Sequence, residues 1–331
     1  MTYYCAFQAC RSSCNFRNHT FVLGQGTFTP SATMKLPSVT ALGLAQLASS
    51  SLITTWGTIS LPTANTSILG NIYNHWLALP NATFDLTRSL VSPVTNPLRI
   101  PMTGARKTAI IEPSRSALVI IDMQEFFLNP ELSPRAEGGR TAVQPTLNMI
   151  KAFRAKGMKV LWVNWGLDGR DLREMPPALL AGFSDDGGPL TTFGSDMGTL
   201  KNGTVVGKKL MRGEWNARPY GPLYDEQVKG VAAGTDLYFH KNRLSGLWGA
   251  QTPLGIWLEE NQMTTLFFGG VNSDQCVWGT FLDAYYKGYD VVYVDDIAAT
   301  ISPQSATEMV RYNADIDGFI TNSTLVVPAL A

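Results

Sequence analysis

The sequence predicts an α/β fold built on a doubly wound, mainly parallel sheet with helices on both faces. From Ser116 onward, short apolar runs typical of buried strands alternate with segments whose apolar residues recur at helical spacing. Strands and helices that alternate in this way form parallel sheets covered on both faces. The residues before this region lack a sustained period, and we expect residues 58–109 to form an N-terminal arm packed on the core, with a hairpin near 71–88.

The first predicted elements of this region are two strands joined by a helix. Residues 117–121 form an apolar strand that ends at Asp122, and residues 141–156 carry apolar side chains at helical spacing. Residues 159–165 form the second strand. The segment 166–234 is too long for a plain connection, so part of it should form the rim of a site.

The later elements are centred on a buried strand that leads into a helix. Residues 264–268 form an apolar run, Gly269 and Gly270 break it, and a helical pattern starts near Cys276. The other predicted elements are a strand at 236–240 followed by Lys241, a helix at 252–261 capped by Thr252, a strand at 290–294 that ends at Asp295, and a helix that begins at Ser302-Pro303.

The composition excludes several classes of function. Only 16% of the 331 residues are charged and the charges balance, so we expect neither a nucleic-acid surface nor a membrane-binding basic run. Histidine stands at positions 19, 75 and 240, with no two at ligand spacing, which disfavours a histidine-based zinc site and a Ser-His-Asp hydrolase. We therefore expect a small-molecule substrate, without a cofactor or a bound metal.

The first 57 residues have the features of a leader. Residues 1–33 show no sustained pattern, and we expect a disordered or artefactual leader upstream of a working start at Met34. Residues 34–57 have the layout of a secretory signal peptide, although an amphipathic helix without a targeting role is the alternative. The signal predicts a secreted protein, with a cytoplasmic one as the alternative. Glycosylation of a secreted product is permitted by sequons at Asn65, Asn81, Asn202 and Asn322.

Three chemically suited residues are expected to meet at one edge of the sheet. Ligands bind beyond the carboxyl ends of the strands in such sheets, where Asp122, Lys241 and Cys276 follow three different strands. A thiol is mostly protonated near pH 7, so it needs a base such as Asp122 and a cation such as Lys241. The start of a helix also favours the thiolate. Each residue has a structural alternative: the aspartate as a turn cap, the lysine as a solvated charge and the cysteine as a packed hydrophobe.

Three short motifs stand at the ends of predicted strands. They are SALVIIDMQEFF at residues 116–127, KNRLS at 241–245 and GVNSDQCV at 270–277. Together they resemble the first-strand motif, the lysine segment and the nucleophile loop of the isochorismatase-like cysteine hydrolases. The resemblance covers most of residues 110–331, which we assign to a hydrolase domain. It implies an Asp-Lys-Cys triad at Asp122, Lys241 and Cys276, a six-stranded parallel sheet, a homo-oligomer, and a cis peptide between Val271 and Asn272.

Departures from the family pattern narrow the expected activity. Nicotinamidase-type members carry an aspartate and paired histidines for a metal after the second strand, whereas residues 164–170 read NWGLDGR. Members that cleave a vinyl ether need no thiol, so the presence of Cys276 favours acyl chemistry. The bend that contains Val271, Asn272 and Gln275 is the candidate oxyanion hole. Candidates for the substrate pocket are Phe127, Asn164, Trp165, Trp215, Arg243 and Trp278.

The favoured hypothesis is a metal-independent cysteine hydrolase that cleaves a C–N bond of a small amide, imide or ureido compound through a cysteine acyl-enzyme. One alternative is an isochorismatase-type hydrolase that cleaves an enol ether and releases pyruvate. The other is a non-catalytic binding protein in which residues 58–109 and 166–234 fill the cleft.

Overall fold

The computed structural model describes residues 51–54, 57–60 and 65–331. The chain divides into two units, residues 1–47 and 48–331, and the described residues all belong to the second. The predicted leader at 1–33 and most of the predicted signal peptide at 34–57 lie outside the described residues. None of the helices within the described ranges is long and apolar enough to cross a membrane.

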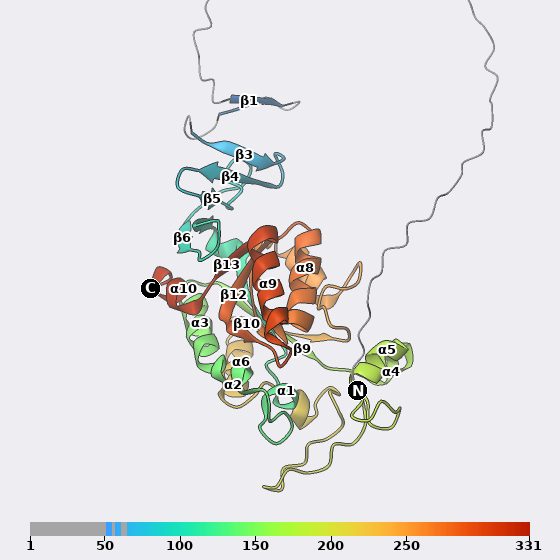
Figure 1. The fold of residues 1–331 in the computed structure, drawn as a ribbon. Helices are drawn as coiled ribbons and strands as arrows, with labels where there is room; N and C mark the ends of the chain where they lie inside the picture. Colours follow the sequence, from blue (N-terminus) through green and yellow to red (C-terminus); the bar gives the residue numbers. More distant parts are fainter. Residues whose placement is uncertain (1–50, 55–56, 61–64) are drawn as a thin grey trace, which may run out of the picture. The chain divides into compact units, whose positions relative to one another are not determined.

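A six-stranded sheet forms the centre of the second unit (Figure 1). All of its strand pairs are parallel, in the order β10-β9-β8-β11-β12-β13. The strands are β8 (Ser116–Ile121), β9 (Lys159–Trp165), β10 (Asp236–Lys241), β11 (Thr265–Val271), β12 (Asp290–Ala299) and β13 (Phe319–Thr321). The strand order reverses between β8 and β11, which is the position where ligands bind in doubly wound sheets. The predicted fold class is confirmed.

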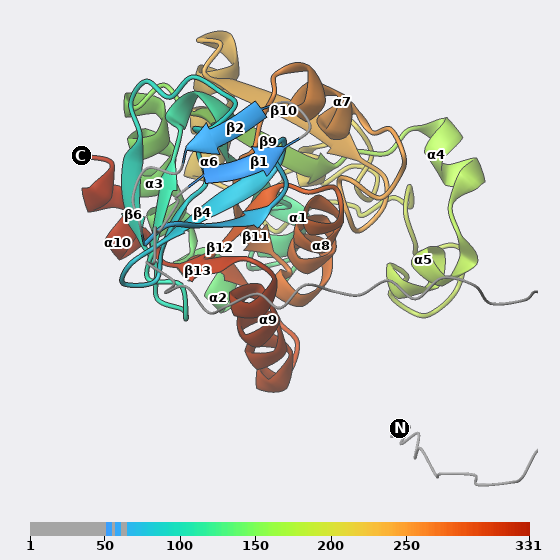
Figure 2. The same cartoon turned by 90° about the horizontal axis from the view of Figure 1, so that it is seen from above.

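Helices cover both faces of this sheet because successive side chains of each strand point to opposite sides. Leu118 and Ile120 of β8 pack in one core and Val119 and Ile121 in the other. The first core is covered by α3 (Val143–Ala155), α6 (Pro222–Ala232) and α10 (Ser323–Ala329). The second core is covered by α7 (Pro253–Glu260), α8 (Trp278–Tyr286) and α9 (Gln304–Asp317). In Figure 2, α3 and α8 lie on opposite sides of the central strands.

Two strands extend further than their sequence pattern predicts. β11 continues through both glycines. Gly270 adopts φ +123°, and a Cβ atom there would lie 1.9 Å from the Ile121 carbonyl oxygen, so this position of the strand requires glycine. Glycine therefore allows β8 and β11 to approach closely. β12 continues past Asp295 and Asp296 because both carboxylates find partners: Arg311 at 2.7 Å and the backbone N–H of Ser323 at 2.7 Å.

A five-stranded sheet precedes the parallel one. Its strands, in the order β3-β4-β5-β7-β6, are β3 (Ser67–Gly70), β4 (His75–Leu79), β5 (Thr83–Asp85), β6 (Leu98–Pro101) and β7 (Thr108–Ile111). β4 and β5 pair antiparallel, which confirms the predicted hairpin. Ile100 and Ile111 belong to the same core as α3. Arg88 donates two hydrogen bonds of 2.8 Å to the Asp290 carboxylate at the start of β12, and both residues are buried.

The remaining elements are short. β1 (Ser51–Thr54) and β2 (Gly57–Ser60) form an antiparallel pair. The short helices are η1 (Pro113–Arg115), α1 (Glu125–Leu128), α2 (Glu137–Thr141), α4 (Gly169–Glu174), α5 (Pro177–Gly182), η2 (Trp215–Ala217) and the π-helical turn η3 (Ser273–Val277).

Candidate active site

The carboxyl edge of the sheet brings three predicted residues together. Asp122 follows β8, Lys241 ends β10, and Cys276 lies in η3 after β11. The Nζ atom of Lys241 lies 2.8 Å from Oδ2 of Asp122 and 3.4 Å from Sγ of Cys276. Asp122, Lys241 and Cys276 are 0%, 5% and 2% exposed. A carboxylate, an ammonium and a thiol are therefore in contact at a site shielded from water.

Backbone groups hold the Asp122 carboxylate in this position. Asp122 adopts φ +51°, and its N–H is shared between the Val163 carbonyl oxygen at 3.2 Å and Oδ1 of Asn164 at 3.1 Å. Its own Oδ1 accepts from the N–H of Trp165 at 3.0 Å. Burial raises the pKa of Asp122, while the positive charge and hydrogen bond of Lys241 oppose that rise. A carboxyl group in this environment binds a proton more readily than one in water.

The Lys241 ammonium lies between the acid and the thiol. Besides its contacts with Asp122 and Cys276, it donates to the carbonyl oxygen of Arg243 at 3.1 Å. Its nitrogen also lies 3.9 Å from the ring centroid of Trp165. A cation over an indole face is stabilised by the ring quadrupole, so these contacts together hold the charge in place despite its burial.

Burial dominates the electrostatics of the Cys276 thiol. It raises the pKa of Cys276 to about 12, even though the charge of Lys241 acts in the opposite direction. The negative charge of Asp122 and its hydrogen bond with the thiol raise this pKa further. We expected the lysine and the helix start to favour the thiolate, but the loss of hydration outweighs them. The resting thiol is protonated at neutral pH and has its proton acceptor beside it.

The loop before the nucleophile has an unusual backbone. The peptide bond between Val271 and Asn272 is cis, as the resemblance implies. The carbonyl oxygen of Asn272 accepts from the N–H groups of Gln275 at 3.1 Å and Val277 at 3.2 Å, which closes the turn around Cys276. Val271 is buried and the Gln275 side chain is exposed. An oxyanion role for Val271, Asn272 and Gln275 stays a prediction.

A family model describing the isochorismatase domain matches residues 116–316, more than half of the chain. The chain belongs to the isochorismatase family. A cysteine hydrolase from Pseudomonas syringae pv. phaseolicola has a similar structure, with a TM-score of 0.50 and 18% identity over 71% of this chain and 97% of that one. This likeness shows the shared fold.

Two further solved structures are similar. One is a nicotinamidase from Bacillus subtilis, with a TM-score of 0.48 and 23% identity over 63% of this chain and 99% of that one. The other is an N-carbamoylsarcosine amidase from Thermoplasma acidophilum, with a TM-score of 0.45 and 22% identity over 63% of this chain and 96% of that one.

Two of the predicted pocket residues of this isochorismatase-family enzyme pack directly around the triad. Asn164 is fully buried, and both ends of its amide are used: Oδ1 accepts from Asp122, and Nδ2 donates to the Tyr238 hydroxyl at 3.2 Å. Trp165 is also fully buried, with its indole beside Lys241. In the described structure these two side chains position the triad.

The other four pocket candidates lie further out. Phe127 and Trp278 are partly buried and pack against the apolar cluster that contains Cys276. Arg243 donates to two backbone carbonyls, at 2.7 and 3.0 Å. Trp215 lies in η2 and lines a separate cavity. The structure thus places Phe127 and Trp278 against the core that contains Cys276, and the side chains of Arg243 and Trp215 make their contacts elsewhere.

Gln124 was not predicted and is a central support of the site. It is fully buried, and its Nε2 donates to the carbonyl oxygens of Trp165 at 2.8 Å and Ala217 at 2.5 Å. Its Oε1 accepts from the N–H of Trp165 at 3.1 Å. The feature of the sequence that could have predicted this role is the position of Gln124 two residues after Asp122, just beyond the end of a buried strand.

The segment 166–234 covers the site from above Trp165. The rings of Phe183 and Phe193 lie 5.0 Å from the Trp165 ring. Lys209 is 1% exposed and donates to the Phe183 carbonyl oxygen at 3.1 Å and to the Asp185 carboxylate at 2.8 Å. This buried lysine holds the aromatic cover in place.

Two carboxylates that follow β9, those of Asp168 and Asp171, form the N-terminal cap of helix α4. No three His, Cys, Asp or Glu side chains in the described ranges lie together as a potential metal site. Asp168 caps α4 by accepting from the N–H of Asp171 at 3.0 Å, and Asp171 accepts from the N–H of Asp168 at 2.9 Å. Asp171 also accepts from Asn242 at 2.7 Å. Both side chains are therefore committed to hydrogen bonds inside the protein.

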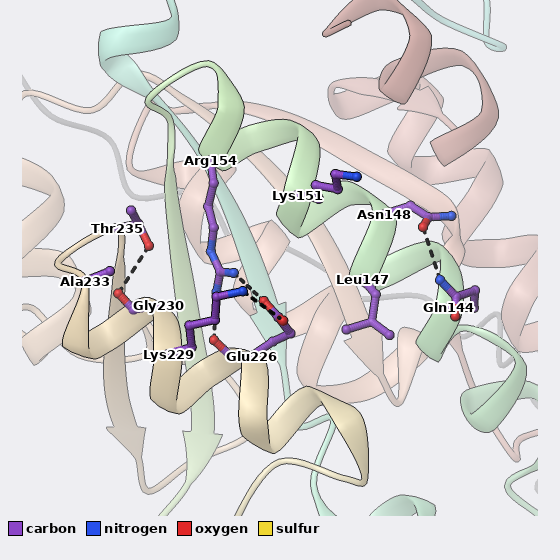
Figure 3. Close-up of a pocket in the computed structure, with 10 residues that line it drawn as sticks. All are labelled: Gln144, Leu147, Asn148, Lys151, Arg154, Glu226, Lys229, Gly230, Ala233 and Thr235. Atoms are coloured by element: carbon purple, nitrogen blue, oxygen red, sulfur yellow. Dashed lines mark hydrogen bonds and ion pairs between the residues drawn. The ribbon is translucent and has the colours of Figure 1, made fainter.

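The described cavities differ in their relation to the triad. One of about 550 Å³ lies between α3 and α6 and contains none of the predicted site residues (Figure 3). In it, Arg154 reaches from α3 to Glu226 on α6. A smaller cavity of about 140 Å³ has Lys241 in its wall, together with His240 and Trp248. The smaller cavity therefore adjoins Lys241, one of the three catalytic candidates.

Proposed function

We propose that this isochorismatase-family enzyme is a metal-independent cysteine hydrolase that cleaves a C–N bond of a small amide, imide or ureido compound. The observation that carries the proposal is the contact of Lys241 with Asp122 at 2.8 Å and with Cys276 at 3.4 Å. A nucleophile, a proton acceptor and a cation in mutual contact are the parts that covalent acyl transfer requires.

The protonation states support a concerted first step. Because the thiol of Cys276 has a pKa of about 12, it carries its proton at neutral pH. Asp122 accepts this proton as the sulfur attacks the substrate carbonyl carbon, and the carbonyl electrons move onto the oxygen. The raised pKa of Asp122 suits it to hold the proton until the next step.

The remaining steps return the enzyme to its starting state. The oxyanion collapses, the C–N bond breaks, and Asp122 gives its proton to the leaving amine. Water then attacks the thioester and transfers a proton to Asp122. As the C–S bond breaks and the acid leaves, Asp122 passes that proton to the sulfur, which restores the thiol and the carboxylate. Lys241 keeps the carboxylate oriented throughout, and the turn formed by residues 271–276 is the proposed site of the oxyanion.

The surroundings of the nucleophile favour an uncharged substrate with an apolar or planar acyl group. Cys276 belongs to a core cluster with Trp165 and Phe193, and Phe127 and Trp278 pack against it. An ionic group placed there would lose its hydration, and the nearby charges of Lys241 and Asp122 are already paired with each other. A neutral carboxamide or urea loses less hydration free energy when it enters such a site.

A panel of small amides, imides and ureas, together with isochorismate, tests the proposal. Ammonia and pyruvate are measured, and mass spectrometry follows an acyl adduct on Cys276. Cys276→Ala should abolish hydrolysis while circular dichroism stays unchanged, and Cys10→Ala, which removes a thiol from the N-terminal stretch, should retain it. Hydrolysis that survives in Cys276→Ala would end the covalent proposal, and thiol-independent pyruvate release would identify the enol-ether reaction instead.

A further inference from the structure

A cavity of about 410 Å³ lies beside the edge strand β10, and it shares His240 with the smaller cavity that Lys241 lines. We call it the Trp215 cavity, and Tyr238 and His240 of β10 form part of its wall. Side chains alternate along a strand, so Tyr238 and His240 point to the opposite face from Phe239 and Lys241. None of the three triad residues lines the Trp215 cavity, whose size is typical for a small-ligand site.

The wall of the Trp215 cavity combines aromatic rings with an arginine. The guanidinium carbon of Arg218 lies 5.1 Å from the ring centroid of Trp215 and 4.8 Å from that of Tyr224. Both rings line the cavity with it. The guanidinium group of Arg218 thus lies over two aromatic rings, and such contacts leave the N–H groups able to pair with a ligand.

These N–H groups have unused hydrogen-bonding capacity. The ion pair of Arg218 Nη2 with the Glu125 carboxylate is 3.7 Å long, beyond hydrogen-bond distance. Nε of Arg218 is buried and has no hydrogen-bond partner among the described residues, so the nitrogens open to a ligand are the terminal Nη1 and Nη2. The Glu125 carboxylate is instead occupied by Asn129 at 3.1 Å and the N–H of Gly221 at 3.2 Å. The side chain of Arg218 is 37% exposed, so a ligand can reach it.

Arg154 in the cavity of Figure 3 shows the contrast. All three of its guanidinium nitrogens donate, to Glu226 and Asp236, at 2.5 to 2.9 Å. An arginine bound in this way holds two elements together and has little left for a ligand. Arg218 lies in a comparable setting without such partners.

We infer that the Trp215 cavity binds a small planar carboxylate. The carboxylate pairs with the N–H edge of Arg218, and the two groups share a plane because a fork of parallel hydrogen bonds requires it. The ring of the ligand then continues the plane of the guanidinium along Trp215 and Tyr224. Burial lowers the pKa of His240, so this wall presents a neutral ring to the ligand at pH 7.

Such a ligand would sit close to the support of the catalytic candidate Asp122. The Tyr238 hydroxyl accepts from Asn164 at 3.2 Å, and Asn164 in turn accepts from the N–H of Asp122 at 3.1 Å. Two hydrogen bonds therefore separate the wall of the Trp215 cavity from Asp122. The acid released by an amide hydrolase has the chemistry that this cavity would recognise.

Isothermal titration with benzoate tests the inference on the full-length protein. Benzoate should bind, whereas benzamide and cyclohexanecarboxylate, which lack the charge or the planar ring, should bind about tenfold more weakly. Arg218→Gln should weaken benzoate binding about tenfold or more. Arg135→Gln, at an exposed position, should leave binding unchanged.

Two further variants separate this site from the triad and from a folding defect. Lys241→Met should bind benzoate as the native protein does, and this result holds whether or not Cys276 proves to be the nucleophile. Tyr224→Leu removes one aromatic face without changing the charge and should also weaken binding, with an unchanged melting temperature. Equal affinity for benzamide, equal affinity in Arg218→Gln, or loss of binding in Lys241→Met would each overturn the inference.

Discussion

Replacing Lys241 by methionine tests the proposed triad at its centre. Methionine keeps an unbranched apolar side chain but removes the ammonium that lies 2.8 Å from Asp122 and 3.4 Å from Cys276. Leaving one member of a buried ion pair alone costs about 3–5 kcal/mol. The folded variant avoids this cost by keeping Asp122 protonated, which burial already favours.

The cost then falls on the reaction, because the base must be ionised before it can take the thiol proton. At about 1.4 kcal/mol per factor of ten, kcat/KM should fall roughly 10²- to 10⁴-fold. The melting temperature should change little. The thiol of Cys276 should also stay protonated at neutral pH, since Lys241 is the group whose charge favours the thiolate.

Two measurements check this expectation. The first is kcat/KM from initial rates of ammonia release with the best substrate of the panel. The second is the rate of Cys276 alkylation by iodoacetamide across pH, read by mass spectrometry. Lys151→Met, at an exposed position on α3, serves as the control and should behave as the native protein does. A Lys241→Met variant within tenfold of native kcat/KM would show that the ammonium has no part in the reaction.

Other consequences concern the supports of the site and its pH dependence. Asn164→Ala removes one of two acceptors of the Asp122 N–H and should lower kcat about tenfold with little change in KM; an unchanged kcat would contradict the positioning role. Arg88→Met leaves Asp290 buried without its cation, so urea unfolding should show a loss of about 3–5 kcal/mol, part of which Asp290→Asn in the same chain should restore. Because the raised pKa of Asp122 must be exceeded for it to act as a base, the acid limb of kcat/KM should lie above pH 3.8, and a limb at or below that value would exclude this base. The pKa of Cys276 is about 12 in the folded protein against an ordinary 9.0, so the folded state holds this proton more tightly and stability should fall as pH rises above about 9. The melting temperature of Cys276→Ala should fall less steeply with pH than that of the native protein. Parallel curves of melting temperature against pH would contradict the shift.

The sheet at the centre of the fold was largely predictable from local pattern. The strand predicted at 159–165 coincides with β9, and the strand predicted at 117–121 is one residue shorter than β8. Buried parallel strands are continuous apolar runs, and such runs can be recognised in the sequence without knowledge of the neighbouring strands. The five strands between residues 67 and 111 are three to five residues long, which is too short for a pattern to emerge.

The site was predictable only in its outline. Asp122 and Cys276 follow neighbouring strands on either side of the switch point, and Lys241 ends the strand two places from β8, so the topology alone directs all three to one edge. Asn164 and Trp165 were interpreted as contacts for a substrate, whereas their hydrogen bonds and ring contacts hold the triad. Gln124 and Lys209 escaped notice because their partners lie far away in the chain.

The sequence by itself determined which segments form the central strands and which reactive side chains lie near the carboxyl ends of β8, β10 and β11. Only the tertiary structure decided how those side chains behave, because a pKa depends on hydration and on charges supplied by distant segments. Burial in a core that includes distant residues such as Phe193 removes water from the thiol and outweighs the charge of Lys241, which is visible in the sequence. The tertiary fold also places Arg218 against two aromatic rings beside an edge strand, and the spacing of these residues in the sequence does not predict this arrangement.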